Sequence, residues 1–249
     1  MTKILSIHKP IKKIYSNYFL FSHYLAGLID GDGHISKIGQ IVICFNEKDL
    51  ENAYFIKGQI GYGKIRKIKN KKAYNYIVSN SKGISHISSL VKDKIKHPNK
   101  IDQFNDRLYP KYIPFKTSND SIINWNTSWF SGFIESDGYF RISILNKEVR
   151  LLCQIDQKIN ILLKQIQNNF GGYIGYRKDQ DSYYYSSVSY KNMFKIIKYF
   201  DQYSLQSKRY YLRYFFLRKS LILIQNKEHL KDEGFSKIKR YKVKMENMK

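Results

Sequence analysis

Two aspartates, Asp32 and Asp137, occupy matching positions in two related ten-residue segments. The first segment reads YLAGLIDGDG from Tyr24, and the second reads WFSGFIESDG from Trp129, 105 residues later. Both are aromatic at the first position, have glycine at the fourth and end in an acid, a small residue, Asp and Gly. Agreement at ten consecutive positions indicates an internal repeat rather than a chance match.

The two aspartates stand where a carboxylate is costly unless it binds a cation. Each segment is predicted to be a helix ended by a left-handed glycine, Gly33 or Gly138, which places Asp32 and Asp137 in the last turn. The negative helix end disfavours an acid by about 0.3–1 kcal/mol. Two carboxylates ~6 Å apart repel by about 3 kcal/mol at an effective dielectric near 20. One such Asp alone would more often be a solvated cap, but the duplication favours a pair of metal-binding carboxylates.

Small residues should bring the two predicted helices into contact. Gly27 and Gly31 are four residues apart and share one helix face, and Gly132 and Ser136 repeat the spacing. Small side chains let helix backbones approach closely, so we expect the two helices to pack on a pseudo-twofold axis. The other acids, Asp30 and Glu135, should point away from the partner helix and bind backbone or basic groups of their own repeat.

The rest of each repeat predicts two strands, a helix, a hairpin and further helices, hence an α+β fold with antiparallel sheets. The two cysteines, Cys44 and Cys153, are too few for a disulfide framework or a thiolate metal site. They align between the repeats, which favours buried strand positions over reactive thiols. The expected segments are a first repeat at 17–109, a linker at 110–126, a second repeat at 127–225 and a charged, solvated tail at 226–249.

The charge of the chain favours a nucleic-acid partner. Forty-four Lys and Arg against twenty Asp and Glu give a net charge of +24. Such an excess repels itself unless a polyanion neutralises it, and the basic residues alternate with aromatic ones along the whole chain. A membrane partner is disfavoured because the sequence lacks a basic amphipathic helix and a lipidation signal. The abundance of residues with A/T-rich codons points to an organelle, a mitochondrion in particular.

The segment from Leu25 to Gly33 resembles the motif of the LAGLIDADG homing endonucleases, and Phe130 to Gly138 resembles a degenerate second copy. The resemblance covers about Asn17 to Gln225 and is to the single-chain, two-motif branch. It implies two pseudo-symmetric αββαββα repeats that form a saddle of two antiparallel four-stranded sheets on double-stranded DNA. It also implies a monomer that cuts both strands across the minor groove with Mg²⁺ and leaves 3′ overhangs.

The resemblance assigns roles to individual residues. Asp32 and Asp137 would hold two or three divalent cations, Mg²⁺ with Ca²⁺ or Mn²⁺ as substitutes, and the carbonyls of Gly31 and Ser136 would add ligands. In the second repeat, Gln157 and Lys208 match the family's catalytic glutamine and lysine. The first repeat departs from the pattern, with Lys48 or Glu47 at the glutamine position and Lys100 or Lys96 as the lysine.

Alternate side chains of the hairpin strands should face the DNA. The candidates for base and phosphate contacts are Lys37, Lys64, Arg66, Arg141, Arg177, Tyr183 and Tyr185. Two other functions are open on the same fold: an intron maturase that binds its own intron RNA, and a DNA-binding regulator. Retention of both aspartates favours cleavage over either.

Overall fold

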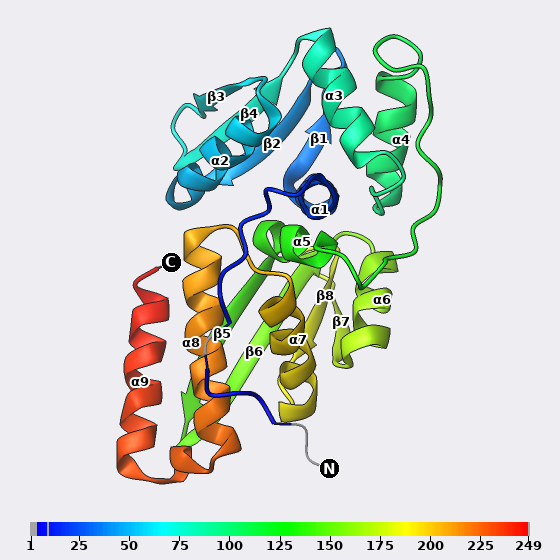
Figure 1. Cartoon of the computed structure of the whole chain (residues 1–249). Coiled ribbons are helices and arrows are strands. Elements are labelled where there is room, and N and C mark those ends of the chain that lie inside the picture. The colour runs from blue at the N-terminus through cyan, green and yellow to red at the C-terminus, as the bar shows by residue number, and fades with distance from the viewer. Residues whose placement is uncertain (1–3, 9, 249) are drawn as a thin grey trace. The chain divides into compact units, whose positions relative to one another are not determined.

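A computed structural model describes residues 4–8 and 10–248 of the chain, which divide into two compact units (Figure 1). One unit comprises Ile14–Asp137 with Gln206–Lys208. The other comprises Gly138–Leu205 and the chain from Arg209 onward, with the N-terminal segment up to Lys13. Because the first unit contains both motif helices, the site where they meet lies wholly within it.

The first unit holds one four-stranded sheet with helices packed on it. Its elements are α1 (Tyr18–Asp32), β1 (Gly33–Ile35), β2 (Ile41–Asn46), η1 (Glu47–Asp49), α2 (Leu50–Ile60), β3 (Lys64–Lys67), β4 (Ala73–Val78), α3 (Ser81–Val91), α4 (Pro98–Arg107) and α5 (Trp129–Asp137). The antiparallel strands follow the order β1-β2-β4-β3. Helix α2 ends at Gly61, whose left-handed φ of 77° is one that glycine adopts without strain.

The second unit repeats this arrangement and adds a C-terminal helix. Its elements are β5 (Gly138–Leu145), β6 (Glu148–Gln157), α6 (Ile161–Phe170), β7 (Tyr173–Arg177), β8 (Ser182–Ser187), α7 (Tyr190–Gln202), α8 (Lys208–Gln225), η2 (Glu228–Leu230) and α9 (Asp232–Glu246). The strand order β5-β6-β8-β7 is that of the first sheet. The predicted α+β fold of two αββαββα repeats is therefore confirmed.

Each sheet has one face packed on helices and one open face, because successive side chains of a strand alternate between faces. In the first sheet, Ile43, Tyr76 and Val78 are buried on the helix side. Cys44, Asn75 and Arg66 pair on the opposite, open face. In the second sheet, Phe140, Ile155 and Tyr185 are on the helix side, and Tyr139, Arg141 and Arg177 are on the open face.

The strand register shows that the expected match between the two cysteines is wrong. Ile43 pairs with Gly33 and Tyr76, and Ile155 pairs in the same way with Gly138 and Tyr185. Ile155 is thus the counterpart of Ile43, and Asp156 is the counterpart of Cys44. Cys153 instead lies on the buried face of its sheet, while Cys44 lies half-buried on the open face. The β5–β6 hairpin is longer than the β1–β2 hairpin, so residues of β6 are displaced along the sequence relative to their counterparts in β2. The local similarity of the two cysteine segments concealed this displacement.

The expectation of a solvated C-terminal tail is also wrong. The tail forms α9, in which Ile238 and Met245 are buried, and the ring of Tyr241 stacks on Phe216 of α8. Figure 1 shows α9 running alongside α8. Apolar residues at helical spacing carry this packing, and the many lysines around them obscured the pattern. Over the described residues, no helix is both long and apolar enough to cross a membrane.

Candidate active site at the paired motif helices

The two motif helices meet at their glycines. A Cβ added to Gly27 would lie 2.0 Å from the carbonyl oxygen of Trp129, and one added to Gly132 would lie 2.0 Å from that of Tyr24. Each of these oxygens belongs to the first residue of the opposite ten-residue segment, so the contacts are related by the expected pseudo-twofold symmetry. The predicted packing of α1 against α5 through small residues is confirmed.

Glycine ends α1 for a reason other than the one expected. Gly33 is extended, with φ −81° and ψ 156°, so the prediction of a left-handed cap is wrong at this residue. A Cβ there would lie 2.5 Å from the Cα of Ile29. Gly33 is thus required by the close approach of the chain as it leaves the helix and enters β1.

The paired helices bring Asp32 and Asp137 together at their C-terminal ends. A Cβ added to Gly31 would lie 2.6 Å from Oδ2 of Asp137 and 1.9 Å from Oγ of Ser136, so the side chains of α5 closely approach α1 at this point. Burial and the charge of Asp137 raise the pKa of Asp32 to about 7, while Lys100 opposes the shift. Two carboxylates in mutual repulsion form a site that a bound cation would stabilise.

The donor set fits a hard cation rather than zinc. No group of three or more His, Cys, Asp or Glu in the described part of the chain is arranged to hold a metal. The site offers two carboxylates, and main-chain carbonyls, water and substrate oxygens would have to complete the coordination of a bound cation. Mg²⁺ takes such a set, because it is bound by a few carboxylates and keeps several waters. Structural zinc sites instead surround the ion with four His or Cys ligands.

The other acid of each motif, two residues before the aspartate of the site, binds a loop of its own repeat, as expected. Both carboxylate oxygens of Asp30 accept backbone N–H groups, Oδ2 from Lys96 at 2.8 Å and Oδ1 from His97 at 3.0 Å. Glu135 accepts the backbone N–H groups of Gln206 and Ser207 at 2.5 and 3.1 Å. These loops lead into α4 and α8, so each buried acid fixes the start of a helix.

The same acids also bind the partner helix, contrary to expectation. Trp129 donates its indole N–H to Asp30 across 2.7 Å, and Tyr24 donates its hydroxyl to Glu135 across 2.6 Å. Tyr24 and Trp129 are equivalent positions, and so are Asp30 and Glu135. The sequence contained a pattern that indicates these bonds: each ten-residue segment has an aromatic hydrogen-bond donor at its first position and an acid at its seventh.

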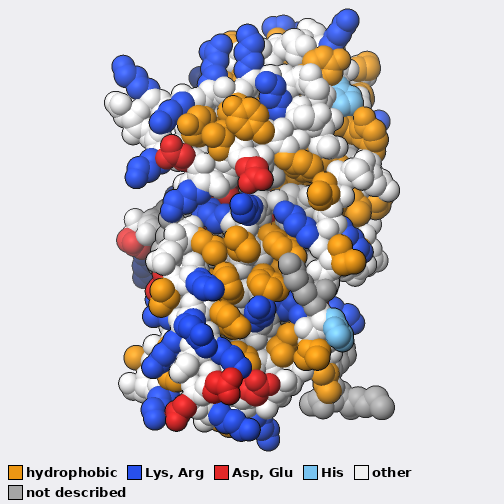
Figure 2. Space-filling view, turned by 60° about the vertical axis from the view of Figure 1, so that its left-hand side comes forward, with side chains coloured by type: hydrophobic (Ala, Val, Ile, Leu, Met, Phe, Trp, Pro, Cys, Tyr) orange, Lys and Arg blue, Asp and Glu red, His pale blue; other side chains and the backbone are white. Residues whose placement is uncertain are grey.

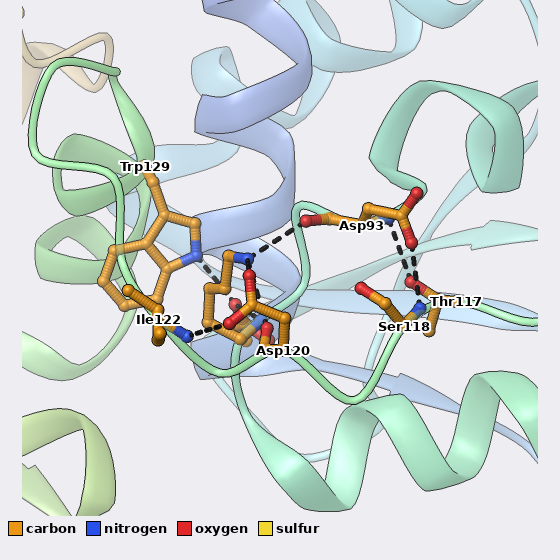
Figure 3. A network of polar contacts seen from close by, with 8 residues as sticks. Asp93, Thr117, Ser118, Asp120, Ile122 and Trp129 are labelled. Carbon is orange, nitrogen blue, oxygen red and sulfur yellow. Dashed lines mark hydrogen bonds and ion pairs between the residues drawn. The ribbon is translucent and has the colours of Figure 1, made fainter.

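Lys100, rather than Lys96, lies beside the acid pair. Lys100 donates to the carbonyl of Gly33, and its charge couples to Asp137, Asp30 and Asp32. The Nζ of Lys96 is instead 3.1 Å from the carbonyl oxygens of both Asp93 and Asp120. Both aspartates are labelled in Figure 3, in a network of polar contacts. Lys96 thus ties the linker to the loop before α4.

The second repeat carries a tyrosine at the place of Lys100. Lys100 follows by three residues the His97 whose N–H binds Asp30, and Tyr210 follows by three the Ser207 whose N–H binds Glu135. Tyr210 donates its hydroxyl to the carbonyl of Gly138 across 2.9 Å, as Lys100 does to Gly33. The expected lysine, Lys208, comes two residues earlier, as the first residue of α8. The two repeats therefore differ chemically at this position.

The strand register does not favour the predicted glutamine. Gln157 pairs with Tyr183 and shares the helix-side face with Ile155. Gln154 and Asp156 lie on the open face, where Nε2 of Gln154 donates to Oδ1 of Asp156 across 3.2 Å. In the first repeat, Glu47 and Lys48 lie in the 3-10 turn after β2.

The DNA-contact candidates divide between the two sheet faces. Lys64 and Arg66 lie exposed on the open face of the first sheet, Arg141 and Arg177 lie on that of the second, and Lys37 is exposed in the β1–β2 turn. Tyr185 is fully buried and donates its hydroxyl to the carbonyl of Gly171, so the prediction that it contacts DNA is wrong. Tyr183 lies on the same helix-side face of the sheet. The tyrosine on the open face is Tyr184, whose ring lies beneath the guanidinium of Arg177. The alternation of side chains along the sequence did not show which of the neighbouring tyrosines faces that side.

Positive side chains outnumber negative ones on the face of the chain drawn in Figure 2. In Figure 2, Lys and Arg side chains are spread over the visible face, with only a few acids among them. This distribution agrees with the net charge of +24 and with a polyanionic partner.

The chain is similar to intron-encoded proteins. A family model described as LAGLIDADG endonuclease matches residues 130–221. The chain is 45% identical to the "Uncharacterized cox1 intron-2 37.2 kDa protein" of Schizosaccharomyces pombe, over 96% of this chain and 77% of that protein. It is 27% identical to the "Intron-encoded RNA maturase bI4" of Saccharomyces cerevisiae, over 74% of this chain and 30% of the maturase. It is 24% identical to the "Intron-encoded DNA endonuclease aI3" of that yeast, over 88% of this chain and 67% of the endonuclease.

Solved structures share the fold. The LAGLIDADG homing endonuclease I-LtrWI bound to target DNA superposes with a TM-score of 0.71, at 21% identity, over 92% of this chain and 98% of that one. I-SmaMI, bound to an uncleaved DNA target in the presence of calcium ions, superposes with a TM-score of 0.66 at 20% identity, over 90% and 98% of the two chains.

Proposed function

The chain belongs to the LAGLIDADG homing endonuclease family, and we propose that it is a monomeric, site-specific endonuclease that cuts both strands of a DNA duplex. Hydrolysis would use Mg²⁺, proceed across the minor groove and leave 3′ overhangs. The observation that carries this proposal is that Asp32 and Asp137 lie close together at the ends of α1 and α5, where the charge of Asp137 raises the pKa of Asp32. A pure binding protein gains nothing from such a pair.

The residues of the site have distinct tasks in this proposal. Asp32 and Asp137, with the carbonyls of Gly31 and Ser136, would hold divalent cations. When bound, such cations would lower the pKa of an attacking water and neutralise the charge that develops on the leaving 3′ oxygen. Lys100, tethered to Gly33, would add positive charge beside one scissile phosphate. Lys208 would do so in the other half of the site, and Gln154 replaces Gln157 as the glutamine to test.

The open faces of the two sheets would bind the DNA. Arginines there can read guanine edges in the major groove, while lysines mainly contact phosphates. We assign base reading to Arg66, Arg141 and Arg177, and phosphate contacts to Lys37 and Lys64. This assignment rests on their open-face or turn positions in the structure.

Cleavage assays test the proposal directly. Because a relative at 45% identity is named for a cox1 intron, the substrate to try is the intronless cox1 gene, and the expected compartment is the mitochondrion. We expect cutting only with a divalent cation. Asp32→Asn and Asp137→Asn should each abolish double-strand cleavage but keep DNA binding in Ca²⁺, and full activity of either variant would refute the assignment.

A maturase function is the second candidate, because a relative at 27% identity is named an RNA maturase. It would use the same positive surface to stabilise folded intron RNA, alone or together with DNA cleavage. Tighter binding to the structured intron RNA than to any DNA duplex, with no cleavage in Mg²⁺, would favour it over the endonuclease.

A further inference from the structure

Arg177, the last residue of β7, is held on the open face of the second sheet by side chains of two other strands. Its Nη1 donates to Oδ1 of Asp156 on β6, and Nε2 of Gln154 donates to the same oxygen across 3.2 Å. The guanidinium carbon lies 4.5 Å from the centre of the Tyr184 ring on β8. A cation at this distance over an aromatic ring is attracted to it. The hydrogen bond and the ring contact together restrict the rotation of the guanidinium.

The ring of Tyr184 lies over Gly175, its partner across the β7–β8 ladder. A Cβ at residue 175 would be 2.4 Å from Cζ and 2.5 Å from the hydroxyl oxygen of that ring. The ring thus fills the space that a side chain on Gly175 would need. Arg177 follows two residues later on the same strand face, so the glycine allows the ring to lie beneath the guanidinium.

The bond to Asp156 changes what Arg177 offers to DNA. The ion pair is partly exposed and contributes little to stability. The carboxylate nevertheless offsets the positive charge of the arginine and repels a nearby phosphate. The bond uses Nη1, and the planar guanidinium carries further donors on Nε and Nη2. A fixed fork of donors with its charge offset suits the edge of a base better than a backbone phosphate.

We propose that Asp156 and Tyr184 are positioning residues that hold Arg177 so that it reads one guanine of the target. The proposal rests on the DNA-binding function proposed above and names a base pair that the second sheet recognises. Arginine binds guanine through two hydrogen bonds, to O6 and N7 in the major groove. A side chain that is fixed before binding loses less conformational entropy when the complex forms. Asp156 would therefore increase specificity at the expense of non-specific attraction.

The equivalent positions of the first sheet carry different side chains. Cys44 is the counterpart of Asp156, and the strand pairings make Asn75 the counterpart of Tyr184. These two positions thus offer neither an acid to bind a guanidinium nor a ring to lie beneath it. The target should therefore not be palindromic at the base pair that Arg177 reads.

Selection of binding sites from a randomised DNA duplex library in Ca²⁺ tests the proposal. The wild-type chain should select a guanine at one position, and Arg177→Ala should identify that position by losing the preference. Discrimination against the other bases there, measured at one fixed salt concentration, should be about 5- to 150-fold.

The positioning residues should have separate effects. Asp156→Ala should lose most of this discrimination yet bind random-sequence DNA more tightly, because the released arginine can contact a phosphate. Its slope of log affinity against log salt should be steeper by up to about 0.9. Tyr184→Leu should lose the discrimination without a steeper slope, since no charge changes. Tyr184→Phe keeps the ring and should retain the wild-type preference.

Glu233→Ala is the matched control, because it also removes an acid from an ion pair, with Lys237 at 2.6 Å in α9. It should leave the base preference unchanged, and melting curves would show that all variants are folded. A wild-type preference or weaker random-sequence binding in Asp156→Ala, or an equal loss of preference in Glu233→Ala, would overturn the positioning role and leave the endonuclease proposal intact. Failure of the wild-type protein to bind any duplex would refute the proposed function and this inference with it.

Discussion

Tyr24 donates its hydroxyl hydrogen to Oε2 of Glu135 across 2.6 Å, at the buried contact between the two motif helices. Asn52 approaches both groups, with its Nδ2 at 2.8 Å from the tyrosine oxygen and 3.3 Å from Oε2. The indole of Trp129 makes the mirrored bond to Asp30. Each helix thus supplies both the aromatic donor and the acid of a reciprocal pair.

Tyr24→Phe should destabilise the protein, because it removes the hydroxyl donor from the buried carboxyl group of Glu135. Hydrogen bonds to charged groups contribute about 1.5–3 kcal/mol, and we expect a loss of free energy of unfolding in that range above pH 7, where Glu135 is ionised. Urea denaturation would measure it. Tyr18→Phe is the control, because Tyr18 is 63% exposed, and a loss as large in that variant would contradict the assignment.

Stability without divalent cations should fall as the pH rises towards neutral. Burial raises the pKa of Asp30 and of Glu135 to about 7, well above values of about 4 in an unfolded chain. Between these values the folded protein binds more protons than the unfolded chain does. Each acid then lowers the free energy of unfolding by up to about 1.4 kcal/mol per pH unit.

This pH dependence can be measured by urea denaturation in EDTA at several pH values between the two limits. Asp30→Asn should flatten the curve by the contribution of one group, whatever its effect on overall stability. A slope equal to that of the wild type would show that Asp30 is already ionised in the folded protein.

Gly27→Ala should disrupt the contact between α1 and α5, because its Cβ would meet the carbonyl oxygen of Trp129 at 2.0 Å. Backbone cannot yield as a side chain can, so we expect a loss of at least about 1–3 kcal/mol. Gly58→Ala in α2 is the matched control, since no atom lies within 4 Å of its added Cβ. That variant should be more stable by about 0.5–1 kcal/mol. A normal melting temperature for Gly27→Ala would refute the close packing.

Lys100→Met should slow the cutting of one strand more than the other, because the second repeat has Tyr210 at the equivalent place. Removing one electrostatic contact of this kind costs about 10²–10³-fold in rate. On a supercoiled plasmid carrying the site, nicked circles should accumulate. Lys82→Met, at an exposed position on α3, should cut normally. Equal slowing of both strands by Lys100→Met would place the lysine at a shared step.

Cys44 should react with a thiol reagent in the folded protein, whereas Cys153 should react only after unfolding. Cys44 lies half-buried on the open face, and Cys153 is fully buried against the helices. Mass spectrometry of alkylated peptides would distinguish them. Bound DNA should protect Cys44 if the open face is the binding surface. Equal labelling of both cysteines would contradict the register of β6.

The repeated motif determined most of what the sequence reveals about this protein. Helical spacing is local, so the shared helix face of Gly27 and Gly31, its repeat in Gly132 and Ser136, and the position of each motif's last aspartate in the last turn follow from the order of residues alone. The αββαββα repeats follow from the same duplication. The sequence determines less securely which face of a sheet a strand residue lies on, because a shift of one residue exchanges the two faces. Only the pairing of Ile155 with Gly138 in the structure shows that Cys153 and Cys44 lie on opposite faces of their sheets.

Contacts between distant segments were decided by the tertiary structure alone. The bond of Tyr24 to Glu135 joins residues 111 positions apart, and the choice of Lys100 over Lys96 depends on which amine reaches the carbonyl of Gly33. The packing of α9 on β5 depends likewise on where the edge of the second sheet lies. No local pattern encodes such distances, because they follow from how helices and sheets pack after each has formed.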